Sequence, residues 1–251
     1  MYVTYFVELE KSMIKRFSFS STSISYMLGM MLLDSIGLYF ALDSVKNIDS
    51  GIIWYSVAIL LLVASLATGF SLTLVYHSSA LAYYVRFSRL KMTNYILSIF
   101  TGSLISTIIY SVAFTALITP LITKVTLGEF YEILSPSNFI PFVVSTAISG
   151  LFILSLTFTI TSSLLVKLGA KASNYAYYIF FALLALSDLS PSASSPFNPF
   201  YEAEDVISYS LVHDGLSVYC IEVLLLALLL LALGAEILKR IKALRLEEVV
   251  W

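Results

Sequence analysis

Six long apolar runs, separated by short polar segments, dominate the pattern of this sequence. A helix needs about 20 apolar residues to cross the hydrocarbon core of a membrane. The six runs of about this length cover residues 22–42, 51–76, 93–119, 138–166, 172–189 and 214–238. The pattern therefore predicts an all-α membrane protein, with six transmembrane helices in a domain over residues 21–251.

The first 20 residues have a different, amphipathic pattern. Read as a helix at about 100° per residue, they place apolar side chains on one face. These side chains are Val3, Phe6, Val7, Met13, Ile14 and Phe17. The opposite face is charged, so we expect residues 1–20 to form a helix in the membrane interface, with Lys11, Lys15 and Arg16 toward lipid headgroups. A solvated N-terminal helix is the alternative.

Lysine and arginine residues are distributed unevenly among the polar segments. In the predicted six-span topology, all but two of the 14 lie on the side that carries both termini. The two exceptions are Lys46 and Lys124. Because cytoplasmic loops of membrane proteins are rich in Lys and Arg, the sequence predicts a multi-pass protein of the cell membrane with cytoplasmic N- and C-termini.

Composition narrows the classes of function. The chain is 59% hydrophobic and 12% charged, and its net charge of −2 provides no overall basic field for nucleic acid. Its single cysteine, Cys220, excludes an intramolecular disulfide framework and a cysteine-based zinc site. Small and hydroxylated residues are frequent in the third and fourth runs, where we expect close helix packing and interhelical hydrogen bonds. They include Thr101, Gly102, Ser103, Ser106, Thr107, Ser145, Thr146, Ser149 and Gly150.

Groups suited to catalysis are few. The two histidines, His77 and His213, are predicted on opposite faces of the membrane, so they cannot act as a pair or share a metal. Gly215-Leu-Ser217 beside His213 is a weak signal for a serine nucleophile. The sequence contains no Gly-x-x-x-x-Gly-Lys-Ser/Thr loop for nucleotide phosphates. We therefore expect no catalytic residue and no cofactor in this chain, and any ATP hydrolysis would occur in a partner.

Two acidic residues fall well inside predicted spans, Asp34 in the first and Glu222 in the sixth. An acidic side chain in lipid costs at least about 2.5 kcal/mol, so both are expected to face protein or water. One interpretation is that they line a transport path or bind a proton or cation. The other is structural, with Asp34 in a hydrogen bond between helices and Glu222 close enough to the outer interface to reach water.

A basic interruption, residues 77–93, separates the second and third apolar runs. It carries Arg86, Arg89 and Lys91 between two apolar helical faces. One of these faces could pack on the membrane domain. The other is then available to a partner that is not part of this chain.

In its layout the chain resembles the permease subunit of type-2 ABC transporters, an exporter-like family. Residues Tyr5 to Phe19 resemble the family's interfacial connecting helix, and the run from Tyr84 to Leu97 resembles its basic coupling segment and the start of its third span. The outer stretch from Ser195 to Ala203, with Asn198-Pro199, is similar to the Asn-Pro dipeptide and short outer helices before the family's last span.

The resemblance implies that two permease subunits, as a homodimer or a heterodimer, form the substrate path in contact with membrane lipids. It also implies two separate ATPase subunits that bind ATP and Mg²⁺. Tyr84, Arg86, Phe87 and Arg89 are then the predicted contacts with the ATPase, because aromatic and arginine side chains supply much of the energy at interfaces. An ion-coupled secondary transporter that uses Asp34 and Glu222, or a non-transporting membrane scaffold, is the alternative. Neither the substrate nor the direction of transport follows from the residues.

Overall fold

A computed structural model of the chain describes residues 2–76, 92–131, 133–172 and 199–239, together with Tyr175, Tyr178 and Ala182. The elements in this part are helices, as predicted, and none is a strand. Five helices are long and apolar enough to cross a membrane, and they match the first four predicted runs and the sixth. They are Ser23–Val45, Gly51–Val75, Asn94–Leu127, Phe139–Leu168 and Cys220–Leu238. The fifth predicted run, residues 172–189, lies almost entirely outside the described residues.

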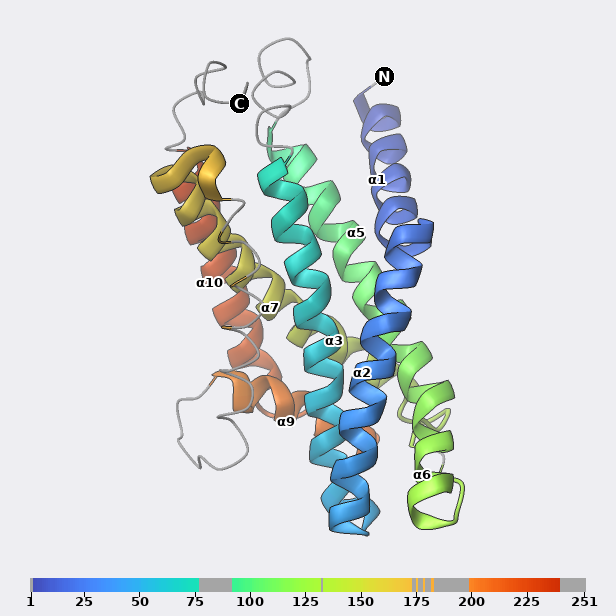
Figure 1. Cartoon of the computed structure of the whole chain (residues 1–251). Helices are drawn as coiled ribbons and strands as arrows, with labels where there is room; N and C mark the ends of the chain where they lie inside the picture. The colour runs from blue at the N-terminus through green and yellow to red at the C-terminus, as the bar shows by residue number, and fades with distance from the viewer. Residues whose placement is uncertain are drawn as a thin grey trace.

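The N-terminal helix α1 (Tyr2–Phe19) is followed after one residue by α2 (Ser21–Val45). Ser20 has an extended backbone, and its Oγ accepts a hydrogen bond from the Ser23 N–H at 3.1 Å, which caps the first turn of α2. In Figure 1, α1 and α2 follow each other down the same side of the bundle, and α1 lies beside α5. The helix predicted over residues 1–20 is therefore present, and it packs along another helix of the bundle.

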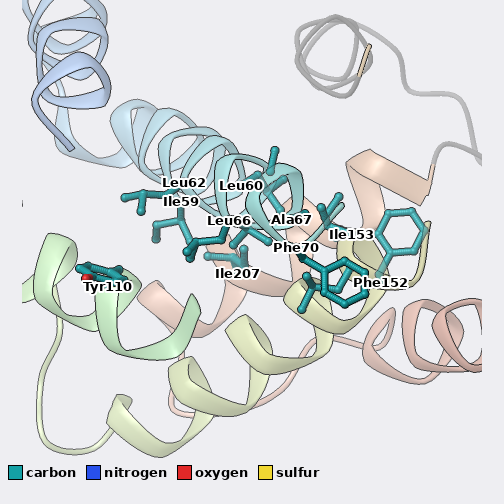
Figure 2. Packing of buried hydrophobic residues seen from close by; sticks show 14 of the residues in the cluster. Ile59, Leu60, Leu62, Leu66, Ala67, Phe70, Tyr110, Phe152, Ile153 and Ile207 are labelled. Atoms are coloured by element: carbon teal, nitrogen blue, oxygen red, sulfur yellow. The ribbon is translucent and has the colours of Figure 1, made fainter. Parts of the chain in front are cut away.

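Helix α3 (Ile48–Tyr76) lies at the centre of the bundle and contacts α2, α5, α7 and α9. Most of the apolar stretch with which it could cross a membrane is buried inside the protein, whereas most of the corresponding stretches of α2 and α10 lie at the surface. Figure 2 shows Ile59, Leu66 and Phe70 of α3 packed toward Ile207 and Phe152 from two other helices. Because α3 is apolar around its whole circumference, neighbouring helices can pack on every side of it.

The third span is longer than the sequence predicted. It was expected to end at residue 119, immediately before Pro120, but α5 (Met92–Ala113) continues through a π-helical turn, η1 (Phe114–Ile118), into α6 (Thr119–Leu127). Proline has no N–H to donate to the carbonyl four residues earlier, and a π turn absorbs this break without ending the helix. The Thr119 hydroxyl donates to the Phe114 carbonyl at 3.3 Å.

Helix α7 (Phe139–Leu168) runs back through the bundle and ends in a short 3-10 turn, η2 (Gly169–Ala172). The last helix, α10 (Cys220–Lys239), runs parallel to it and contacts it more extensively than any other element. The sixth span was predicted to start at residue 214, but the helix begins at Cys220. Ser217 ends the preceding loop with a turn, in which its carbonyl accepts from the Cys220 N–H at 3.1 Å.

Between them in sequence is α9 (Pro199–Val212), too short to cross a membrane. Its direction follows from two contacts with α7: Phe200 packs on Phe152 with ring centroids 5.6 Å apart, and the Leu211 carbonyl accepts from Asn138 Nδ2 at 3.0 Å. Helix α9 is thus antiparallel to α7 and covers its first half. The family resemblance of the stretch from Ser195 to Ala203 implied short helices in this part of the chain.

The two ends of the bundle differ in charge. The start of α1, the start of α5 and the C-terminal ends of α3, α7 and α10 gather at the upper end in Figure 1. This end carries Lys167 in the last turn of α7, Lys171 in η2 and Lys239 at the end of α10. The opposite end carries Lys46 after α2 and Lys124 in the last turn of α6. The helices therefore place these lysines at the two ends in the distribution that the sequence predicts.

Candidate functional site

The predicted connecting helix forms a close contact within the bundle, between α1 and α5. A Cβ atom at Gly102 of α5 would lie 3.2 Å from the Met13 carbonyl carbon and 3.3 Å from the Ile14 nitrogen. A larger residue at this position would push the Met13 backbone away by a few tenths of an ångström or more, so glycine favours the close approach of the two backbones. Met13 is buried at this point, so the apolar face predicted for the N-terminal helix packs at least here on protein.

Hydrogen bonds extend the same contact toward the end of α1. The hydroxyls of Ser18 and Ser106 lie 2.6 Å apart, and the Tyr110 hydroxyl donates to the Ser18 carbonyl at 2.8 Å. Gly102, Ser106 and Tyr110 are spaced by four residues, which places them along one face of α5. We call this set, Met13 and Ser18 with Gly102, Ser106 and Tyr110, the α1–α5 contact. Tight packing and buried hydrogen bonds make it a rigid junction.

The basic residues predicted for the connecting helix lie on the outside of α1. Lys11, Lys15 and Arg16 are exposed, and Lys11 forms an exposed ion pair with Glu8 at 3.7 Å. Phe6 belongs to α1, but its side chain is outside the described part. The predicted ATPase contacts Tyr84, Arg86, Phe87 and Arg89 also lie outside the described residues.

Asp34 is the most deeply placed acidic side chain among the candidates. It is 7% exposed and lies on the face of α2 that also buries Met27, Met31, Leu38 and Leu42. Its Oδ2 atom has no hydrogen-bond partner among the described residues. Asp34 therefore faces the interior of the bundle.

Glu222 has a different environment. It is exposed in the first turn of α10 and is within electrostatic range of Glu202 of α9. Burial raises the pKa of Glu202, and the negative charge of Glu222 raises it further. Asp34 is buried in α2, whereas Glu222 is exposed in α10. The two carboxyl groups therefore have different surroundings, unlike those expected of two acids that line the same transport path.

A third group of polar residues belongs to α5 and α7. A Cβ atom at Gly150 of α7 would lie 3.1 Å from Cγ2 of Thr107, so the two helices approach closely at this pair. Ser111 and Thr146 are fully buried, as are Ser103 and Ser155, and none of these four hydroxyls has a hydrogen-bond partner among the described residues. The sequence indicated small and hydroxylated residues here. It gave no signal for which of them would be left without a partner.

Catalytic groups are not brought together in the described part of the chain. His213 is exposed and stacks on Tyr209 with ring centroids 4.4 Å apart. No cluster of three or more His, Cys, Asp or Glu side chains suitable for a metal ion occurs among the residues whose positions are described. The Ser217 hydroxyl donates to Asp205 Oδ2 at 2.6 Å. This bond fastens the loop before α10 to α9.

Comparison with protein-family models, curated proteins and solved structures finds no match to this chain. The resemblance to type-2 ABC permeases therefore stays a prediction from the sequence.

Proposed function

We propose that this chain is the transmembrane permease subunit of an ATP-driven exporter, that it works with a second permease subunit, and that separate ATPase subunits bind to its basic end. The observation that carries the proposal is the α1–α5 contact. The basic helix α1 is joined tightly to α5, and α5 is also the helix that follows the basic segment 77–91 in the chain. A partner that binds either basic segment would therefore act on the same membrane helix.

This arrangement supports coupling between an ATPase and the membrane helices, because a displacement of α1 would be transmitted to α5 through closely packed backbone. Side chains in a long, flexible contact would absorb a small displacement, whereas Gly102 against the Met13 backbone leaves little space for one. Nucleotide-driven closure of an ATPase dimer would then bias α5 between two positions. Such a two-state element is what a coupling mechanism requires.

We also propose that the fifth apolar run, residues 172–189, crosses the membrane, as the sequence predicts. Helix α7 ends at Leu168, about 24 Å along the helix from Phe152, and Phe200 at the start of α9 packs on Phe152. Helix α9 continues from this level to the opposite end of the bundle, beside Asn138. Six crossings bring both termini to the basic end, which the excess of Lys and Arg assigns to the cytoplasm.

The short helix α9 gives further support. The resemblance implies a short outer helix after an Asn-Pro dipeptide and before the last span. Helix α9 starts at Pro199, directly after Asn198, and precedes α10. Its position against the first half of α7, at the end with few lysines, agrees with an outer location.

Affinity purification from native membranes tests the proposal. We expect an ATPase subunit to copurify with the wild-type chain and to be lost from the Arg86→Glu/Arg89→Glu double variant. The Lys46→Glu/Lys124→Glu variant has the same change of charge at the opposite end, so it serves as the matched control and should retain the ATPase. Absence of any ATPase from the wild-type preparation, across several mild detergents, would contradict the proposal.

A second candidate function is ion-coupled transport, and the buried Asp34 favours it, because its Oδ2 atom has no hydrogen-bond partner among the described residues. In that case substrate uptake into vesicles would follow an imposed proton or cation gradient without ATP. Transport by an Asp34→Asn variant would then stop, whereas an ATP-driven exporter would keep its activity.

A further inference from the structure

We propose that α1 stands upright at the basic end of the protein, and that the membrane surface crosses the chain where α1 meets α2. Helix α1 and the start of α5 then lie outside the hydrocarbon core of the membrane. Lys15 and Arg16, exposed near this level, contact the phosphate groups of anionic lipids. The proposal concerns how the chain sits in a bilayer and does not depend on an ATPase partner.

Helix α1 runs beside α5 and in the same direction. Met13 lies against Gly102, and further along both helices Ser18 lies against Ser106. The two helices are therefore parallel over this contact, as Figure 1 shows. Because α5 belongs to a helix that is long and apolar enough to cross a membrane, α1 is aligned with the crossing direction. A helix that lay in the plane of the membrane interface would cross α5 at a steep angle.

The surface of α1 also differs from that of an interfacial helix. An interfacial helix buries its apolar face at the boundary of the lipid chains. In α1, Met13 of the apolar face is instead buried against protein. The side chains of α1 that the structure describes as exposed before Phe19 are all polar or charged: Glu8, Lys11, Ser12, Lys15 and Arg16. This part of α1 therefore presents a surface suited to water and lipid headgroups.

The exposed surface changes from charged to apolar at the junction of α1 and α2. Arg16 is exposed and charged, whereas Phe19 is exposed and apolar. From Phe19 to the exposed Phe40, the one charged residue in the sequence is Asp34, and it is buried. At 1.5 Å per residue this stretch is about 32 Å long, close to the roughly 30 Å of a hydrocarbon core. The exposed Asp43 follows it. The core therefore covers α2 and begins just after Arg16.

The same boundary can be placed on α5. The Ser106 hydroxyl lies 2.6 Å from that of Ser18, beside the junction, so the boundary crosses α5 near Ser106. The helical stretch Asn94–Leu127 has 34 residues and is about 50 Å long, more than a hydrocarbon core needs. From Ser106 to the exposed Lys124 it covers about 27 Å, which is close to the thickness of the core. Residues 94–105 then project about 18 Å beyond the core at the basic end.

The positions of two positive charges agree with this boundary. Lys15 and Arg16 lie between the levels of Gly102 and Ser106. If the core began at Asn94, both charges would be about 12–18 Å inside it, where a charged side chain is strongly unfavourable. With the boundary near Ser106, both lie at the level of the lipid phosphates, which attract Lys and Arg. Side chains of a helix tilt toward its N-terminus, which here directs both away from the core.

Spin labels on single cysteines in nanodiscs test the orientation of α1, in a Cys220→Ala background. Collision rates with oxygen, which concentrates in the hydrocarbon, and with a water-soluble nickel chelate give the depth of each label. We expect Lys11→Cys to lie in water and Phe19→Cys to lie about 12 Å deeper. Equal depths at these two exposed positions would overturn the upright orientation, because a helix in the membrane plane holds both at one level.

The position of the boundary on α5 has its own test. Leu97 is exposed, and hydropathy places it inside the third span. We expect the label on Leu97→Cys to collide with the nickel chelate as often as that on Lys11→Cys. Leu28→Cys, at an exposed position of α2, should collide mainly with oxygen. A label on Leu97→Cys as deep as the one on Leu28→Cys would overturn the boundary near Ser106.

Thermal unfolding in nanodiscs of defined composition tests the lipid contact. The melting temperature should be higher in phosphatidylglycerol than in phosphatidylcholine, and Lys15→Gln and Arg16→Gln should each reduce this difference. Lys11→Gln has the same change of charge and is the matched control, because Lys11 lies further from the core and forms an ion pair with Glu8 at 3.7 Å. An undiminished difference in Lys15→Gln and Arg16→Gln would overturn the lipid contact. So would an equal gain from inorganic phosphate added to phosphatidylcholine nanodiscs.

Discussion

The hydroxyl oxygen of Ser18, in the last turn of α1, lies 2.6 Å from that of Ser106 in α5, and both side chains are buried. Eighty-eight residues separate the two serines in the chain. Their hydrogen bond joins a helix that the sequence pattern assigned to the membrane interface to one that crosses the membrane. This junction gives α1 its mechanical connection to the rest of the protein.

Gly102→Leu should weaken the α1–α5 contact. The new side chain would meet the Met13 backbone, and overpacking of this kind typically costs about 1–3 kcal/mol. We expect a lower melting temperature in detergent and faster proteolysis within α1. Gly29→Leu is the matched control, because a Cβ at Gly29 has no atom within 4 Å among the described residues. Similar losses in both variants would show that the α1–α5 contact has no special role.

In the assembled transporter, Gly102→Leu should also uncouple ATP hydrolysis from transport. The ATPase would still bind, because the substitution lies away from the basic segment 77–91, but substrate would no longer stimulate hydrolysis to the wild-type level. ATPase assays in proteoliposomes measure this effect. Full stimulation in a variant whose α1 is shown to be loosened would argue against transmission through α1.

Asn138→Leu should destabilise the end of the bundle with few lysines. Nδ2 of Asn138 donates to the carbonyls of Ile133 and Leu211 at 3.0 Å each, and the side chain is buried. Each buried carbonyl left without a donor costs about 1–3 kcal/mol. The melting temperature should fall, whereas Ser137→Ala, one residue away on the exposed surface, should leave it unchanged. An unchanged melting temperature for Asn138→Leu would mean that Asn138 does not hold α9 in place.

Asp34→Leu should stabilise the isolated protein if Asp34 has no ligand. Removing a buried polar group without a partner is worth about 1–3 kcal/mol, and leucine continues the apolar face of α2. Thermal unfolding at neutral pH measures this gain. A loss of stability, together with loss of ion-driven transport in Asp34→Asn, would instead favour the ion-coupled alternative.

The contribution of Glu202 to stability should decrease as pH rises. Its folded-state pKa is raised from the ordinary value of 4.5, first by burial and then by Glu222. Between the unfolded and folded pKa values the folded protein holds a proton that the unfolded chain has released, so unfolding releases a proton and stability falls with increasing pH. Glu202→Gln should remove this slope. The same slope in wild type and variant would exclude Glu202 as its source.

The neighbour of Glu202 provides an internal check. Glu222→Gln removes one of the two causes of the raised Glu202 pKa and leaves burial in place. The pH-dependent loss of stability should therefore shift toward lower pH without disappearing. Unfolding curves measured at several pH values would show the shift, and an unshifted curve would mean that the two carboxylates do not interact in solution.

Local hydropathy alone predicted most of the fold. Runs of apolar residues specify helices that can cross a membrane, because a helix satisfies its backbone hydrogen bonds within one segment and so exposes few polar groups to lipid. The positions of α2, α3 and α7 were therefore close to their predicted ranges. Two predicted span boundaries were wrong, each at a residue that changes the backbone hydrogen bonding. Near Pro120 the third span continues through a π turn instead of ending. At Ser217 a turn makes α10 begin at Cys220, later than predicted.

The candidate site depended on contacts between distant segments, which hydropathy does not encode. An amphipathic pattern shows that Met13 needs an apolar partner, but only helix packing decided that this partner is the backbone at Gly102. Likewise, the sequence placed serine and threonine in both α5 and α7. Helix packing decided which of these hydroxyls are buried without a partner among the described residues. Apolar character is a property of each segment, whereas register requires two helices to fit together.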